Sequence, residues 1–310
     1  MAKIVVVGSY VVDLMSRTPH IPTAGETVLG GPFQMGPGGK GGNQAVAAAR
    51  LNSDVTMVTK VGKDIFGNDA IKNFEQEGIS TQYITRHPKE QTGTALIAVD
   101  NNSENMIVVS PGACGLITKQ DVEAARSAFI ESDIVLLQLE TSIEAVKATI
   151  DLAHELNKPV ILNPAPYQEI TPDLLAKVTY ITPNETEAKL LTGIEVTSET
   201  TAREAAKKLI TTGVKTVIIT LGKRGCFVYD GTDEGRLIDA YNVLAVDTTG
   251  AGDAFNGAFA TYISSGYSLD DAVIRANAVG ALAVTKVGTA IAMPYEDELE
   301  NFLQDKVISN

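Results

Sequence analysis

The segment VDTTGAGDAFNG, residues 246–257, leads from a turn into an apolar helix and carries a carboxylate in the expected first helical turn. Gly250, Ala251 and Gly252 stand where that helix should begin, so their backbone N–H groups have no partner within the helix and can point at an anion. Asp253 follows directly. A carboxylate beside an anion cradle makes chemical sense when the cradle holds a transferring phosphoryl group and the carboxylate takes a proton from the attacking hydroxyl. The segment therefore predicts a small-molecule kinase, and the alternative is that Asp253 only complements the helix dipole.

Outward from this segment, short β-branched runs alternate with helical patterns. The runs lie at residues 4–7, 55–59, 134–137, 160–162, 180–182 and 217–220, and segments such as 142–157 and 200–212 between them carry apolar residues at helical spacing. Strands joined by helices favour a mainly parallel sheet with helices on both faces. We therefore predict an α/β fold for one domain over residues 1–310.

Two regions break this alternation. Residues 10–35 are rich in Gly, Pro and Thr without a clear helix, and residues 92–109 form two apolar runs around a polar turn. Strands inserted into an α/β frame can form a small sheet of their own. We expect a β lid over the active site, and the alternative is an edge extension of the main sheet.

Composition excludes several partners and sites. The chain has 310 residues, 44% of them hydrophobic, and a formal net charge of −13, which argues against nucleic acids and anionic membranes as partners. Cys114 and Cys226 form no CxxC motif, so we predict two buried thiols without a disulfide framework or zinc site. His20, His87 and His154 show neither triad nor metal spacing. The apolar start of the chain is too short for a signal peptide, and no stretch of about 18 uncharged apolar residues occurs, so we expect a cytoplasmic protein.

A second glycine cluster, GPGGKGGNQAVAAARL, occupies residues 36–51. It matches GxGxxG from Gly36 to Gly41, but it does not follow the first strand, so the match to a dinucleotide site is weak. It is not a Walker A loop, because Gly41 follows Lys40 where Ser or Thr is required. The pattern predicts a flexible loop that ends in a helix at about Asn43, where the backbone can approach a ligand closely. A purely structural turn is the alternative.

Four motifs occur in a fixed order: GGKGGN at 38–43, NETE at 184–187, TLGKRG at 220–225 and DTTGAGD at 247–253. With them the chain resembles the ribokinase-like (PfkB) carbohydrate kinases, from its first strand to the AVTKVG segment near 283–288. The resemblance implies a large αβα domain and a β lid that often serves as a dimer interface. The two irregular regions fit that lid, so a homodimer through it is expected.

The resemblance also implies roles for individual residues. Asp253 resembles the general base that accepts the proton of the sugar's primary hydroxyl, and Gly250, Ala251 and Gly252 resemble the donors of the anion hole. Such electrostatic stabilisation contributes on the order of 3 to 4 kcal/mol per donor. The sugar site implied by the family comprises Asp13, Gly39, Lys40, Gly41, Gly42, Asn43, Glu140 and Asp253.

The cofactors implied by the resemblance are ATP, Mg²⁺ and an activating K⁺. Asn184 and Glu187, one helical turn apart, resemble the pair that orders magnesium through its waters, and the alternative for them is a helix cap with a solvated glutamate. The implied nucleotide site comprises Asn184, Thr220, Leu221, Gly222, Lys223, Arg224, Gly225, Gly252 and Asn277. The implied potassium loop comprises Asp247, Thr249, Ala283, Lys286, Gly288 and Ala292.

Two positions depart from the family pattern. The family's ribose kinases have asparagine two positions before the substrate aspartate, where this chain has Val11, and serine where it has Ala292. The first change removes a polar contact to the sugar and the second a hydroxyl near the cation. We therefore expect ATP-dependent phosphorylation of the 5-hydroxyl of D-ribose, with 2-deoxyribose as the next candidate and a nucleoside as a third.

Two other classes of function are open at this point. A dinucleotide-binding oxidoreductase is suggested by the GxGxxG match and would bind a nicotinamide cofactor without ATP. A non-catalytic sugar sensor on the same fold is the other, although a sensor has no need of the intact GAGD segment at 250–253.

Overall fold

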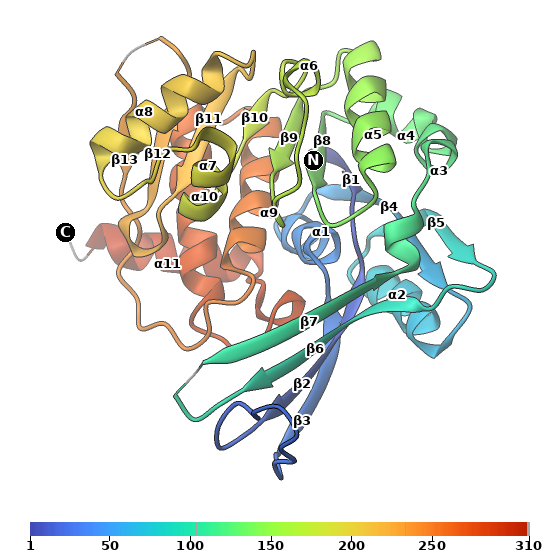
Figure 1. Ribbon diagram of the computed structural model, residues 1–310. Helices are drawn as coiled ribbons and strands as arrows, with labels where there is room; N and C mark the ends of the chain where they lie inside the picture. Colours follow the sequence, from blue (N-terminus) through green and yellow to red (C-terminus); the bar gives the residue numbers. More distant parts are fainter. Residues whose placement is uncertain (103, 233, 309–310) are drawn as a thin grey trace.

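The computed structural model describes residues 1–102, 104–232 and 234–308 and has a large and a small β-sheet (Figure 1). The nine strands of the large sheet lie in the order β13-β12-β11-β10-β9-β8-β1-β4-β5. Their bounds are β1 Lys3–Val7, β4 Asp54–Gly62, β5 Ser80–His87, β8 Ile134–Gln138, β9 Val160–Asn163, β10 Tyr180–Ile181, β11 Thr216–Thr220, β12 Cys226–Tyr229 and β13 Arg236–Ile238. Neighbours from β5 to β11 pair in parallel, and only β12 runs against the others. The α/β prediction is confirmed, and the chain order reverses between β1 and β8.

Helices cover both faces of the large sheet, as the apolar strands predict. On one face lie α1 Lys40–Arg50, α2 Ile65–Gln76, α9 Ala251–Ser264, α10 Leu269–Ala283 and α11 Glu296–Ile308, with η3 Ala290–Ala292. On the other lie α3 Lys119–Ala124, α4 Arg126–Glu131, α5 Ile143–Glu155, α6 Pro172–Leu175, α7 Glu185–Thr192 and α8 Glu199–Ile210, with η1 Ala113–Leu116. A further short turn is η2 Gly222–Arg224.

The first strand shows why its sequence is continuously apolar. Ile4 and Val6 pack into the cluster formed by α1, α9 and α10, whereas Val5 and Val7 pack into the cluster formed by α5 and α8. Side chains alternate between the two faces of a strand, so both sets of positions must be apolar when both faces are covered.

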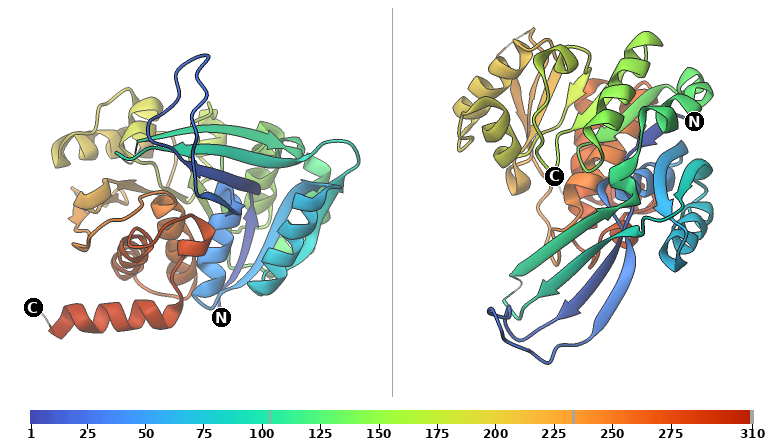
Figure 2. Two further views of the ribbon diagram at one scale, coloured as in Figure 1. Left: turned by 90° about the horizontal axis from the view of Figure 1, so that it is seen from below. Right: turned by 45° about the vertical axis from the view of Figure 1, so that its right-hand side comes forward.

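The small sheet has the strand order β3-β2-β6-β7 and projects from the large α/β body (Figures 1 and 2). Its strands are β2 Val11–Arg17, β3 Phe33–Gly38, β6 Thr92–Val99 and β7 Asn105–Gly112. A separate sheet therefore forms from the two regions that break the α/β alternation. Both regions end three residues later than predicted, and the polar turn around residue 103 lies partly outside the described residues.

One local prediction was wrong. No flexible loop leads to Asn43, because β3 continues to Gly38 and α1 begins at Lys40. Gly39 makes the turn alone with a φ of 83°, and a Cβ at this position would lie 2.8 Å from the Val11 backbone nitrogen. A residue without a side chain thus replaces a loop of several residues.

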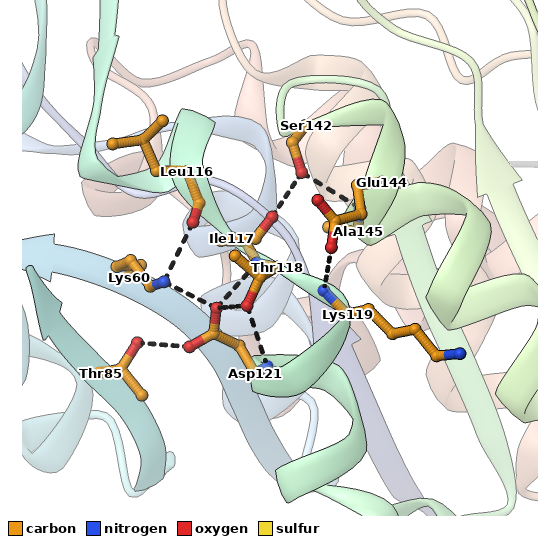
Figure 3. A network of polar contacts seen from close by, with 10 residues as sticks. All are labelled: Lys60, Thr85, Leu116, Ile117, Thr118, Lys119, Asp121, Ser142, Glu144 and Ala145. Atoms are coloured by element: carbon orange, nitrogen blue, oxygen red, sulfur yellow. Dashed lines mark hydrogen bonds and ion pairs between the residues drawn. The ribbon is translucent and has the colours of Figure 1, made fainter.

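A polar network anchors the small sheet to the large one (Figure 3). Lys60 Nζ on β4 pairs with Asp121 Oδ2 on α3 at 2.7 Å and donates to the Leu116 carbonyl in η1 at 3.0 Å. Thr85 on β5 donates to Asp121 Oδ1 at 3.1 Å. Burial opposes ionisation of Asp121, but the bonds from Lys60 and Thr118 together lower its pKa. Because η1 directly follows β7, these contacts fix the end of the small sheet against β4 and β5.

Both cysteines are free and buried, as predicted. None of the helices in the described part of the chain has the length and apolarity of a membrane span.

Candidate active site

The candidate site begins where the strand order reverses. Ser9 follows β1 and Glu140 follows β8, and the Ser9 hydroxyl donates to Glu140 Oε2 at 2.5 Å. The backbone N–H of Lys40, the first residue of α1, donates to the same oxygen at 2.8 Å. Open α/β sheets bind ligands in the crevice outside the carboxyl ends of the strands at such a reversal. Glu140 therefore joins β1, β8 and α1 at the position where a ligand is expected.

Asp253 lies in the first turn of α9, where the sequence places it. The helix begins after Gly250, whose φ of 79° turns the chain into it. The Asp253 side chain is buried, at 6% exposure, and its Oδ2 accepts from Asn43 Nδ2 and its Oδ1 from Gln44 Nε2, both at 2.9 Å. A carboxylate that only complemented the helix dipole would need neither amide. The two bonds hold it in one orientation between α1 and α9.

Lys40 supplies positive charge to this cluster of carboxylates. Its pKa is raised, chiefly by the charge of Asp253 and further by Glu140 and Glu187, although burial acts in the opposite direction. The ammonium group therefore stays charged and can neutralise a phosphoryl group, because like a point charge it needs no fixed geometry.

Asp13 lies inside β2 of the small sheet, not at a strand end as the sequence was interpreted. Its Oδ2 accepts from the Thr289 hydroxyl at 2.9 Å. Burial raises the pKa of Asp13 to about 6, the Thr289 bond acts the other way, and the charges of Glu140 and Asp253 raise it further. A Cβ at Gly38 on β3 would lie 2.2 Å from Asp13 Oδ1, so only glycine fits beside this carboxylate.

A cavity of about 530 Å³ lies between the small sheet and the segments 245–249 and 288–291. Asp13 lines it, together with Met15, Arg17, Ile97 and Ile107 from the small sheet. Asp253 is not part of its lining. The cavity therefore opens over the predicted sugar side of the site, with the small sheet as one wall.

Asn184 and Glu187 form a helix cap, and Glu187 is not solvated. Asn184 Oδ1 accepts from the Glu187 backbone N–H at 2.8 Å, while Glu187 Oε2 accepts from the Asn184 backbone N–H at 2.9 Å. Glu187 is only 9% exposed, and burial raises its pKa. In the described residues no cluster of three His, Cys, Asp or Glu side chains could hold a metal by itself. The pair therefore fits a contact to magnesium through water, which leaves the cap intact.

The predicted nucleotide residues converge on one backbone segment. Thr220 forms a parallel bridge with Asn184, and its N–H donates to the Pro183 carbonyl at 2.9 Å. A Cβ at Gly225 would lie 2.0 Å from the Ile238 carbonyl oxygen, and the buried Asn277 amide donates to that same oxygen at 3.3 Å. The TLGKRG turn and Asn277 thus contact the same residue at the end of β13, although 52 positions separate Gly225 from Asn277 in the sequence.

The predicted cation loop is also assembled from separate segments. Asp247 Oδ1 accepts from the Thr249 N–H at 2.9 Å, and its Oδ2 accepts from the Gly288 N–H at 3.0 Å. These bonds hold the two loops side by side and leave backbone carbonyls as the available ligands. The Lys286 ammonium instead pairs with Glu298 at 2.5 Å, and Ala292 is buried in η3.

Several residues of the site were not found from the sequence. They are Ser9, Gln44, Gln138, Asn163 and Thr289, whose side chains bond Glu140, Asp253, one another or Asp13. Gln44 could have been noticed because it directly follows GGKGGN. The other four stand in no motif, and only the folded chain brings them to the site.

Comparison with known proteins decides the class. Residues 1–296 match the pfkB family carbohydrate kinase model. The chain belongs to the pfkB family of carbohydrate kinases. It is therefore a sugar phosphotransferase, which confirms the kinase prediction over the oxidoreductase alternative.

Individual relatives cover nearly the whole chain. A ribokinase of Haemophilus influenzae is 40% identical over 299 residues, which are 96% of this chain and 97% of that protein. A deoxyribokinase of Salmonella typhi is 38% identical over 301 residues, with 97% and 98% covered. The solved structure of Arabidopsis thaliana ribokinase complexed with ribose and ATP superposes with a TM-score of 0.89 at 29% identity, covering 98% of this chain and 99% of that one. The kinase fold predicted from the motifs is confirmed.

Proposed function

We propose that this kinase transfers the γ-phosphoryl group of ATP to the primary 5-hydroxyl of D-ribose, with 2-deoxyribose as the alternative sugar. The observation that carries the proposal is the buried Asp253 carboxylate in the first turn of α9, held by Asn43 and Gln44 beside the N–H groups that open the helix. Ribokinases and deoxyribokinases among the relatives support both sugars.

In this proposal Asp253 takes the proton of the sugar hydroxyl as that oxygen attacks phosphorus. The N–H groups of Ala251 and Gly252 and the Gly250 turn stabilise charge on the transferring group, and Lys40 neutralises part of it. Phosphoryl transfer needs mainly positioning and electrostatic stabilisation, which this arrangement of charges can supply. The leaving group is ADP, and the proton remains on Asp253 until solvent removes it.

The sugar lies between the two sheets in this proposal. Asp13 accepts ring hydroxyl bonds from the side of β2, and Glu140 and the glycine-rich start of α1 close the other side. Within the described residues, Asn43 Oδ1 is buried without a hydrogen-bond partner. A buried acceptor left unpaired costs about 1 to 3 kcal/mol, so a hydroxyl of the substrate is its natural partner.

Magnesium and potassium complete the proposed cofactor set. Asn184 and Glu187 would hold magnesium through its waters, and the metal supplies positive charge to the ATP phosphates. The paired loops at Asp247 and Gly288 would hold potassium through backbone carbonyls, next to the turn that begins α9. Equal rates in potassium and in a large organic cation at matched ionic strength would remove potassium from the proposal.

We also propose a homodimer through the small sheet. Apolar side chains on it are exposed, with Leu96 on β6 opposite Val108 on β7. A second copy would cover them, as exposed apolar strands favour association. A fully active monomer by light scattering at micromolar concentration would contradict this arrangement. ATP as substrate and two free thiols fit the cytoplasm.

The decisive experiment is a coupled ADP-release assay with ribose, 2-deoxyribose, hexoses and nucleosides. The proposal expects the highest kcat/KM for one of the two pentoses. A nucleoside or hexose preferred over both would overturn the substrate assignment, and sugar binding without ADP release would favour a sensor.

A further inference from the structure

We infer that Gln44 is a positioning residue for Asp253 and acts through a buried chain of amides. This inference rests on the proposed role of Asp253 as the base. Gln44 is completely buried in α1. Its Nε2 donates to Asp253 Oδ1 at 2.9 Å and to Asn163 Oδ1 at 3.1 Å, and its Oε1 accepts from Gln138 Nε2 at 2.7 Å. One side chain thus connects the carboxylate of α9 to the ends of β8 and β9.

The acceptor groups at the ends of this chain permit only one orientation of Gln44. An ionised carboxylate only accepts hydrogen bonds, so Asp253 must face the Gln44 amino group. Asn163 donates its own amino group to the Thr182 backbone carbonyl at 3.2 Å, which leaves its Oδ1 to face Gln44. A flipped Gln44 would set its carbonyl oxygen against both acceptors. The network therefore fixes the direction from which Asp253 is held.

The same chain continues to the helix turn that carries the proposed anion hole. The Thr182 hydroxyl donates to Asn256 Oδ1 at 2.6 Å, and Asn256 Nδ2 donates to the Gly252 carbonyl at 2.8 Å. The ends of β8, β9 and β10 thereby set both the carboxylate and the first turn of α9. A shift of either group relative to the other would break a buried hydrogen bond, which is costly in a low-dielectric interior.

These amides are not needed to join α1 and α9. The two helices already pack closely, because a Cβ at Gly257 would lie 2.6 Å from the Ala47 Cβ. Buried polar groups weaken an interface unless each finds a partner, and Gln138 Oε1 lacks one among the described residues. A Cβ at Gly8 would lie 2.2 Å from that oxygen, so glycine is required there too. A polar chain kept where apolar packing would suffice points to a role in orientation.

The first test is Gln44→Met, which keeps the length of the side chain and removes both hydrogen-bonding groups. We expect kcat to fall about 10- to 100-fold, since small displacements of a catalytic group have effects of this size. The KM values for sugar and for ATP should stay within about twofold, because Gln44 touches neither ligand in the proposed site. A wild-type kcat would overturn the inference, as would a loss confined to KM.

A matched control lies at the other end of the same helix. Thr261 in α9 bonds the Ser53 hydroxyl, just beyond α1, at 2.9 Å, and both are buried. Thr261→Val also removes a buried hydrogen bond between the two segments. The control should lower the melting temperature without the fall in kcat. A kcat loss in Thr261→Val as large as in Gln44→Met would assign the effect to general loosening and overturn the positioning role.

The second test combines Gln44→Met with Asp253→Asn. If Gln44 acts through Asp253, the double variant should be no slower than Asp253→Asn alone, within about twofold, because the interaction is already lost. Multiplicative losses in the double variant would overturn the inference. If Asp253→Asn itself keeps near-normal turnover, the proposed base is wrong; if it is inactive while Gln44→Met is normal, only the positioning role is wrong.

Discussion

The two sheets differ in how their apolar side chains are covered. All five residues of β8 in the large sheet are buried, whereas seven of the eight residues of β7 in the small sheet are exposed, Met106 to Val109 among them. Helices cover the large sheet on both faces, and nothing in the described chain covers the outer face of the small one to the same degree. A rigid sheet holds the reacting groups, and a thin sheet carries groups that meet the sugar and, as proposed, a second subunit.

This difference predicts that changes on the large-sheet side affect turnover and changes on the small-sheet side affect sugar binding. The largest effect should come from Asp253→Asn. Turnover should fall roughly 100-fold or more, because general-base catalysis contributes about that much. Sugar and ATP binding, measured by calorimetry, should stay within a few fold.

The matching change on the small sheet is Asp13→Asn, which should raise the KM for the sugar more than it lowers kcat. Near-normal turnover in Asp253→Asn would remove it from the mechanism, and a pure kcat loss in Asp13→Asn would remove the contrast between the sheets.

The next largest effect compares one substitution in both sheets. Val135 on β8 is fully buried, and Val108 on β7 is 53% exposed. Val135→Ala should lower the free energy of unfolding by about 2 to 3 kcal/mol, from two lost methyl groups and the cavity they leave. Val108→Ala should change it by about 0.5 kcal/mol or less in the isolated chain. Urea unfolding measures both, and equal losses at low protein concentration would show that the small sheet is covered after all.

The choice of sugar should depend on the first residue of β2. Val11 is 2% exposed and lies on the same strand face as Asp13, two residues away. Where the family's asparagine would pair with a sugar hydroxyl, valine leaves that hydroxyl without a partner, at a cost of about 1 to 3 kcal/mol. Val11→Asn should therefore shift the ratio of kcat/KM toward ribose by roughly 5- to 150-fold.

Both sugars should be measured on both variants, because the ratio cancels changes in folding or concentration. An unchanged ratio would show that Val11 does not set the preference between ribose and 2-deoxyribose.

The smallest predicted effect is a pH dependence confined to sugar binding. Burial raises the pKa of Asp13 to about 6, with Glu140 and Asp253 nearby and Thr289 bonded to it. As the pH falls through 6 the carboxyl becomes protonated and loses its capacity as an ionised acceptor. The KM for the sugar should rise about tenfold per pH unit below that point.

Asp13→Asn supplies the control, because its amide does not titrate in this range. A KM that follows the same profile in Asp13→Asn would assign the pH dependence to another group.

The sequence by itself determined the fold class, the family and the reacting segment. Strands such as β1 are apolar at every position because both faces are covered, and the GAGD segment places Asp253 at a helix start by local rules alone. These signals are local, so they survive without knowledge of the fold. The small sheet was also visible as a break in the alternation, although β3 and α1 meet through Gly39 alone where a loop was expected.

The tertiary structure alone decided which polar side chains surround the reacting carboxylate. Gln44 is 209 positions from Asp253, and Thr289 is 276 positions from Asp13. No periodicity or motif predicts such pairs, because hydrogen bonds between distant segments depend on how helices and strands pack. The sequence names the base, and the fold provides the amides that hold it, since only packing can bring the ends of β8, β9 and β10 to the first turn of α9.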